Sequence, residues 1–122
     1  REGALLYPTV LADIGPSQDL SCRELFAPVI LLTPFEEVDE AIRMADTSDY
    51  GLQAGIFTDS LETVRKAFGR IDVGALLVHD IPTFRVDEMP YGGVKGSGIG
   101  REGPASAIRE MTVEKMLIIN GG

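Results

Sequence analysis

The chain of 122 residues contains one cysteine and one histidine, so few side chains are available for binding zinc or iron. Cys22 has no second cysteine with which to form a disulfide, and a reducing compartment is the expected location. His79 lies inside an apolar stretch and is predicted to be buried. The sequence therefore predicts a cytoplasmic protein without a metal site built from Cys and His.

Basic residues and long apolar runs are also scarce. Eleven Lys and Arg residues stand against nineteen Asp and Glu residues, and the resulting net charge of −8 disfavours binding to nucleic acid. No apolar run approaches the roughly 18–20 residues that span a bilayer, so we expect no membrane partner. Position 1 is Arg rather than Met, and we expect the chain to have been cut from a longer protein.

The sequence does contain an alternation of apolar and amphipathic segments, which is typical of an α/β fold. Their short connections predict a mostly parallel sheet with flanking helices. The length allows one domain, and a compact chain of this size buries roughly 65–70% of its unfolded surface. Strands are predicted over residues 5–11, 29–35, 53–57, 74–79 and 114–120, and helices over 36–46, 59–69 and from Pro104.

The helix near residue 60 carries the clearest start signal. Asp59 and Glu62 have the spacing of a capping box, and Gly69 is a stop signal. Helical periodicity predicts that one side of this helix is buried. The predicted buried side chains are Leu61, Val64, Ala67 and Phe68.

Residues 80–103 read as one long loop that holds six of the fourteen glycines. Gly98 begins a literal G-x-G-x-x-G, but a polar stretch precedes it where a dinucleotide-binding motif needs a strand. Only nineteen residues follow Gly103, too few for the βαβ unit that the motif also requires. We interpret the glycines as supports for a close backbone crossing.

Two further features could carry chemistry. Cys22 lies beside Arg23 but has no nearby base, and we interpret it as a small, partly buried residue rather than a nucleophile. Glu24 and Phe26 are two residues apart at the entrance of a predicted strand and point the same way. They could bind a polar ligand that carries a ring; the other reading is a surface Glu above a core Phe.

Several stretches together resemble the C-terminal part of the NAD(P)-dependent aldehyde dehydrogenase superfamily. They follow the family's order across nearly the whole chain, from about residue 8 to 119. The stretches are PTVL at 8–11, ELFAPV at 24–29, YGL at 50–52, GIFT at 55–58, GALLVH at 74–79, MPYGGVKGSG at 89–98 and GREG at 100–103.

The resemblance implies that residues 8–111 form the second half of a catalytic domain and that residues 112–122 form an oligomerisation strand. It implies oxidation of an aldehyde to a carboxylate with NAD or NADP, through a cysteine thiohemiacetal and thioester. In that family the cysteine nucleophile and the nucleotide-binding domain come from earlier sequence. The fragment alone is therefore expected to be inactive, to need the remainder of its parent as a partner, and to form a homo-oligomer. The alternative is a stand-alone interaction or ligand-binding module that keeps the fold without the enzyme.

The resemblance also implies site residues. Glu24 would accept hydrogen bonds from the nicotinamide ribose, and Phe26 would pack beside the nicotinamide ring. Phe84 and Tyr91, in the loop 80–91, would contact a small aldehyde substrate. No residue of this chain would be catalytic.

Three positions depart from the family pattern. Ala27 stands where Gly is commoner, and Asp46 and His79 stand where Asn is usual. The Asn that corresponds to His79 helps to order the active-site region. Residues 81–91 look most like members that act on short aldehydes, lactaldehyde and glyceraldehyde types among them.

Overall fold

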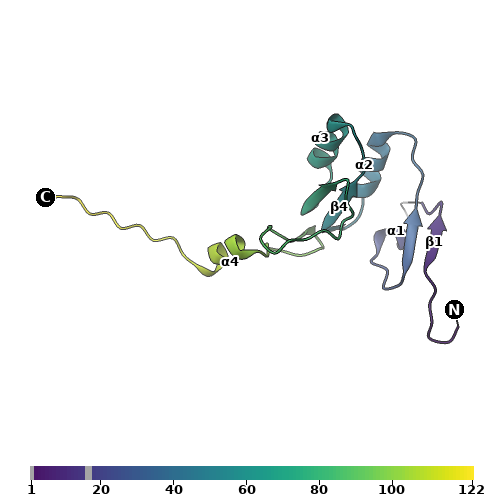
Figure 1. Cartoon of the computed structure of the whole chain (residues 1–122), viewed down its shortest axis with the longest axis horizontal. Helices are drawn as coiled ribbons and strands as arrows, with labels where there is room; N and C mark the ends of the chain where they lie inside the picture. The colour runs from purple at the N-terminus through teal and green to yellow at the C-terminus, as the bar shows by residue number, and fades with distance from the viewer. Residues whose placement is uncertain (1, 16–17) are drawn as a thin grey trace.

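The computed structural model describes residues 2–15 and 18–122. These residues form an α/β arrangement that tapers into a long extended C-terminal segment (Figure 1). The elements follow the order β1 (Thr9–Ala12), α1 (Asp19–Cys22), β2 (Val29–Leu32), α2 (Val38–Asp46), β3 (Tyr50–Gly51), β4 (Gln53–Ile56), α3 (Leu61–Arg70), β5 (Ala75–Val78), β6 (Val94–Lys95) and α4 (Pro104–Met111).

The parallel pairing that the sequence predicts is present. β1 pairs with β2 in parallel, with Thr9 opposite Val29, and β4 pairs with β5 in parallel, with Gln53 opposite Ala75. The short strands β3 and β6 pair antiparallel. The α/β class is thus confirmed, although the strands of the described residues form three separate pairs rather than one sheet.

Prolines set the limits of the first two strands. β1 begins only after Pro8, because proline cannot donate a hydrogen bond to a strand ladder. The observed strand is therefore shorter than the strand predicted over residues 5–11. β2 ends at Leu32, two residues before Pro34. The small helix α1 was not predicted.

Helices α2 and α3 lie side by side next to β4, and they carry the small core (Figure 1). Ile42 of α2 and Ala67 of α3 are the two buried apolar residues of the described chain. On the surface, Asp39 of α2 accepts from Lys66 Nζ at 2.7 Å and from Arg70 Nη1 at 3.1 Å, both on α3. The hydrogen bond from Lys66 lowers the pKa of Asp39.

The start of α3 differs from the prediction. Ser60, and not Asp59, is the N-cap: its Oγ accepts from the backbone N–H of Thr63 at 3.2 Å. The helix also continues past Gly69 to Arg70. Of the predicted buried stripe only Ala67 is fully buried, whereas Phe68 is 74% exposed and Leu61 is exposed as well. A stripe predicted from periodicity needs a partner surface, and the described residues do not supply one for Phe68.

The Ser60 cap can be tested by removing its hydroxyl. Ser60→Ala leaves the N–H of Thr63 without its acceptor, and we expect the free energy of unfolding to fall by about 1 kcal/mol. Asp59→Ala is the matched control, because Asp59 does not cap the helix, and it should cost less. Urea-induced unfolding of both variants measures the difference, and a larger loss for Asp59→Ala would contradict this assignment.

The chain exposes far more surface than a compact protein of its size. Its accessible area is 9746 Å², whereas a folded monomer of 13.1 kDa exposes about 6,400 Å². The unfolded chain would expose about 19,000 Å², so roughly half of the surface is buried and the expected 65–70% is wrong. β2 shows where the excess lies: Ile30 and Leu32 on one face are exposed, although an unbroken apolar strand predicts cover on both faces.

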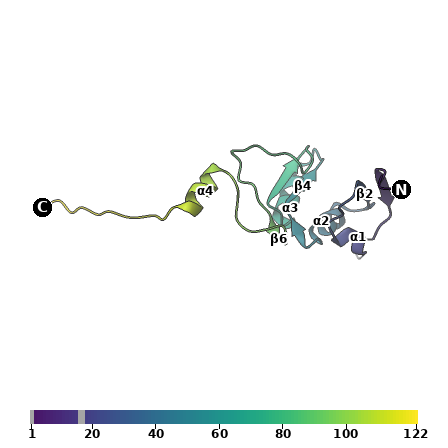
Figure 2. The same ribbon diagram turned by 90° about the horizontal axis from the view of Figure 1, so that it is seen from below.

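The C-terminal part extends away from the body in both views (Figures 1 and 2). α4 begins with Pro104 at its first position, as predicted. The predicted strand over residues 114–120 does not form, because a strand needs a partner and no other segment of the described chain pairs with it.

None of the described helices has both the length and the apolar character needed to cross a membrane. The large exposed side chains after α4 are Val113, Met116, Leu117, Ile118 and Ile119.

Candidate functional site

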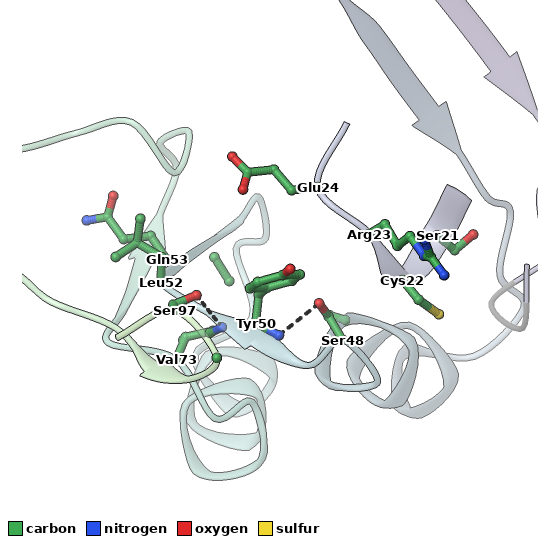
Figure 3. A pocket seen from close by; sticks show the side chains of 14 residues that line it. Ser21, Cys22, Arg23, Glu24, Ser48, Tyr50, Leu52, Gln53, Val73 and Ser97 are labelled. Carbon is green, nitrogen blue, oxygen red and sulfur yellow. Dashed lines mark hydrogen bonds between the residues drawn. The ribbon is translucent and has the colours of Figure 1, made fainter. Parts of the chain in front are cut away.

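A half-open cavity of about 540 Å³ lies between the segment that follows α1, the strand β3 and the Gly-rich loop (Figure 3). Its size is that of a small-molecule site. Polar side chains from several segments line it, and they include Ser21, Arg23, Glu24, Ser48, Tyr50, Gln53 and Ser97.

Glu24 has the chemistry that the sequence-based prediction requires. It lies across the cavity from Tyr50 and Ser97 (Figure 3). Within the described residues its carboxylate takes part in no hydrogen bond or ion pair, so both oxygens can accept from a ligand. A carboxylate without an internal partner at a cavity wall fits the ribose hydroxyls that the resemblance implies.

Phe26 lies outside this cavity. Its side chain is 94% exposed, so the reading of a surface Glu above a core Phe does not describe this chain. An aromatic ring with this much bare surface can pack against a planar group. Cys22 is partly buried, as predicted, and lines the same cavity as Glu24.

The two predicted substrate contacts lie elsewhere. Tyr91 lines a second cavity beside the Gly-rich loop, where the guanidinium of Arg85 stacks 4.6 Å from the centre of its ring. Arg85 also pairs with Glu102 at 2.8 Å. Phe84 is exposed, and its carbonyl accepts from Gln53 Nε2 at 3.2 Å, which ties the loop 80–91 to a residue of the first cavity. The structure brings neither aromatic residue into the cavity of Glu24.

The Gly-rich loop is a backbone crossing, as predicted. A Cβ on Gly74 would overlap the carbonyl oxygen of Gly92, and a Cβ on Gly92 would lie 2.6 Å from the carbonyl oxygen of Gly100. Gly103 has φ +111° and lies against the carbonyl of Met89. The glycines therefore allow chain segments to pass each other closely.

Sequence reasoning missed the contacts of Lys95. Its Nζ donates to Asp46 Oδ1 at 2.7 Å, to the Asp46 carbonyl at 2.9 Å and to the Ser48 carbonyl at 3.4 Å. Asp46 Oδ1 also accepts from the backbone N–H of Asp72 at 2.8 Å. The signal that could have indicated this pair is the acidic Asp46 at a position where the resemblance implies Asn.

The contact with Lys95 lowers the pKa of Asp46, and the hydrogen bond from the Asp72 backbone acts in the same direction. Because the folded-state pKa lies below the unfolded value, the ionised carboxylate stabilises the fold above that unfolded value. This stabilisation is lost as the pH falls through the folded pKa.

The pH dependence of unfolding tests this pair. Asp46→Asn should lower the urea midpoint at about pH 7, and its difference from the unchanged protein should become smaller at about pH 3, below the ordinary pKa of an Asp carboxyl. A difference of the same size at both pH values would show that the charge of Asp46 makes no contribution.

His79 was predicted to be buried, and this is wrong. Its side chain is 55% exposed, with Nε2 3.7 Å from Asp59 Oδ1 and its ring edge-on to Phe57. The backbone of His79 has φ +58°, in the left-handed region that Asn enters more readily than most residues. His79 directly follows β5, and its left-handed conformation suits the Asn that the resemblance implies at this position.

Comparison with known proteins identifies the family. The model of the aldehyde dehydrogenase family matches residues 1–117. The chain belongs to this family. The resemblance carried by the ordered motifs is thereby confirmed, and the parallel strand pairs are parts of the aldehyde dehydrogenase fold.

Two curated aldehyde dehydrogenases show how much of such a protein this chain covers. The 3-sulfolactaldehyde dehydrogenase of Priestia aryabhattai is 46% identical over 120 residues, which are 98% of this chain and 25% of that protein. The sulfoacetaldehyde dehydrogenase of Neptuniibacter caesariensis is 47% identical over 118 residues, 97% of this chain and 26% of that protein. The chain therefore spans about a quarter of the length of these relatives.

Two solved structures show the same fold. Aldehyde dehydrogenase 21 from Physcomitrella patens, in complex with the reaction product succinate, has a TM-score of 0.84 and 41% identity, over 91% of this chain and 23% of that one. Glyceraldehyde-3-phosphate dehydrogenase GapN from Methanocaldococcus jannaschii, complexed with NADP, has a TM-score of 0.83 and 40% identity, over 91% of this chain and 24% of that one.

Proposed function

We propose that this chain is the C-terminal part of an enzyme that oxidises a short aldehyde to a carboxylate with NAD or NADP. The observation that supports this most is the Glu24 carboxylate, which faces the cavity without a partner among the described residues. Glu24 occupies the place in the ELFAPV stretch at which the family's ribose-binding glutamate stands. GapN, which resembles the chain at 40% identity, binds NADP.

In this proposal the bound NAD(P)⁺ supplies the hydride acceptor, and the chain orients it. Glu24 accepts hydrogen bonds from the ribose hydroxyls and so limits the rotation of the attached nicotinamide. Phe26, which lies outside the cavity, would cover one side of the ring. Phe84 and Tyr91, which also lie outside the cavity of Glu24, would contact the aldehyde from the loop 80–91.

The nucleophile lies in the remainder of the enzyme, and the chain alone is inactive. Cys22 lies two residues before the ELFAPV stretch rather than at the family's nucleophile position. The 9746 Å² of accessible surface supports the need for a further segment, because large apolar side chains such as Ile30 and Phe68 are exposed and exposed apolar patches mark interaction surfaces. The C-terminal residues 112–122 form a strand against a second copy of the enzyme, in a homo-oligomer.

The aldehyde is short. The relatives that resemble this chain are named for 3-sulfolactaldehyde and sulfoacetaldehyde, and others are named for lactaldehyde and aspartate semialdehyde. These aldehydes share a small carbon skeleton with a polar substituent.

The test compares the isolated 122-residue chain with the longer protein that carries it. We expect NAD(P)⁺-dependent oxidation of lactaldehyde or sulfoacetaldehyde by the longer protein, followed as absorbance of the reduced cofactor. No turnover is expected for the chain alone. Turnover by the isolated chain would contradict the proposal that the nucleophile lies outside it. Inactivity of the longer protein on all these aldehydes would contradict the proposed aldehyde oxidation.

A further inference from the structure

The ammonium group of Lys95 donates hydrogen bonds to three acceptor oxygens in a distant part of the chain. They belong to the end of α2 and the turn after it, at Asp46 and Ser48, up to 49 residues away in the sequence. The side chains of Lys95 and Asp46 are only 23% and 35% exposed. An ammonium group has three protons, so these acceptors fix its position.

Each member of this network adjoins a residue of the Glu24 cavity. Gly96 and Ser97 follow Lys95, Ala45 precedes Asp46, and Val73 follows Asp72, whose N–H binds Asp46 Oδ1. Hydrogen bonds from two nearby backbone N–H groups also join these segments. Gly96 N donates to the Asp49 carbonyl at 2.8 Å, and Gly51 N donates to Ser97 Oγ at 2.9 Å.

We propose that Lys95 and Asp46 are positioning residues for the cofactor cavity: their ion pair fixes the wall opposite Glu24 and thereby sets the affinity for the nicotinamide ribose. This inference rests on the proposed function of Glu24. The strand pair β3–β6 has only two residues in each strand, and so few ladder bonds cannot hold the wall rigidly. Lys95 adds bonds that join β6 to α2, and Asp46 extends them to the segment after α3.

The other explanation is that the pair only stabilises the fold. A second ion pair distinguishes the two explanations, because Lys66 Nζ lies at the same 2.7 Å from Asp39 Oδ1 and joins α3 to α2. Lys95 and Asp46 adjoin residues that line the cavity of Glu24, whereas Lys66 and Asp39 neither line it nor adjoin a residue that does. Lys66→Met therefore removes a similar contact without touching the cavity wall.

The experiment measures NAD⁺ and NADP⁺ dissociation constants by calorimetry in the longer protein that carries this chain. For Lys95→Met we expect the Kd and the cofactor KM to rise by at least about fivefold, with kcat changed by less than about twofold. Lys66→Met should leave Kd and KM unchanged. Thermal unfolding of both variants reports their cost to stability.

An unchanged Kd in Lys95→Met, together with a lowered thermal midpoint, would overturn the positioning role and leave a structural one. If Lys95→Met fails to fold, Asp46→Asn decides, because an amide oxygen can still accept from Lys95 and Asp72 but lacks the charge. We expect it to raise the Kd by a smaller factor, and no rise would overturn the inference. If the unchanged longer protein binds neither cofactor, the proposed function fails first.

Discussion

Glu24→Gln in the longer protein that carries this chain should weaken NAD(P)⁺ binding about tenfold, which corresponds to the loss of roughly 1.4 kcal/mol. The substitution keeps the shape of the side chain and one acceptor oxygen but removes the negative charge. Hydrogen bonds to a charged acceptor are about twice as strong as neutral ones. Glu24 has no internal partner among the described residues, so the variant leaves no other group of the chain unsatisfied.

The measurement is a calorimetric titration with NAD⁺ or NADP⁺, with kcat and KM determined alongside. Glu62→Gln is the matched control, because Glu62 lies in the first turn of α3 and does not line the cavity. It should bind the cofactor like the unchanged protein. Equal dissociation constants for the two variants would show that Glu24 does not contribute to cofactor binding.

Gly74→Ala should be the most destabilising single substitution in the Gly-rich crossing. Its new Cβ would overlap the Gly92 carbonyl and lie 2.9 Å from the Leu52 carbonyl oxygen, so rigid backbone surrounds it. The backbone of Gly92 has little room to shift away, because it already lies close to the carbonyl oxygen of Gly100. Forcing extra atoms into such a place costs about 1–3 kcal/mol, and we expect the upper end of that range.

Gly69→Ala is the control for this substitution. Gly69 lies within α3, and a Cβ there would meet nothing within 4 Å. Because Ala is the better helix former, we expect a gain of up to about 1 kcal/mol. The urea midpoints of the two variants should therefore move in opposite directions. A Gly74→Ala variant as stable as the unchanged protein would contradict the close backbone packing at Gly74.

Local signals in the sequence predict the elements well, because apolar runs and helical periodicity act within a few residues. The order of β2, α2, β4, α3 and β5 and the start of α4 at Pro104 follow from such patterns, whereas the two-residue strand β3 was not predicted. The choice between Asp59 and Ser60 as N-cap does not, since both residue types favour that position. Nor does the exposure of Phe68, which depends on which surface packs against α3.

Contacts between distant segments could not be predicted from spacing. Lys95 and Asp46 are 49 residues apart, and only the fold brings their charges to 2.7 Å. The conformation of His79 is a similar case, because its φ of +58° depends on how the chain leaves β5. The role proposed for Glu24 rests on the family resemblance, and the structure adds that Glu24 lines a cavity.

The most direct test of the account is a crystal structure of the longer protein that carries this chain, with NAD⁺ or NADP⁺ bound. We expect a Glu24 carboxylate oxygen to lie about 2.5–3.0 Å from a hydroxyl of the nicotinamide ribose. We also expect the remainder of the longer protein to cover the exposed face of β2, which carries Ile30 and Leu32. A cofactor bound away from Glu24, with this face still open to solvent, would contradict this account.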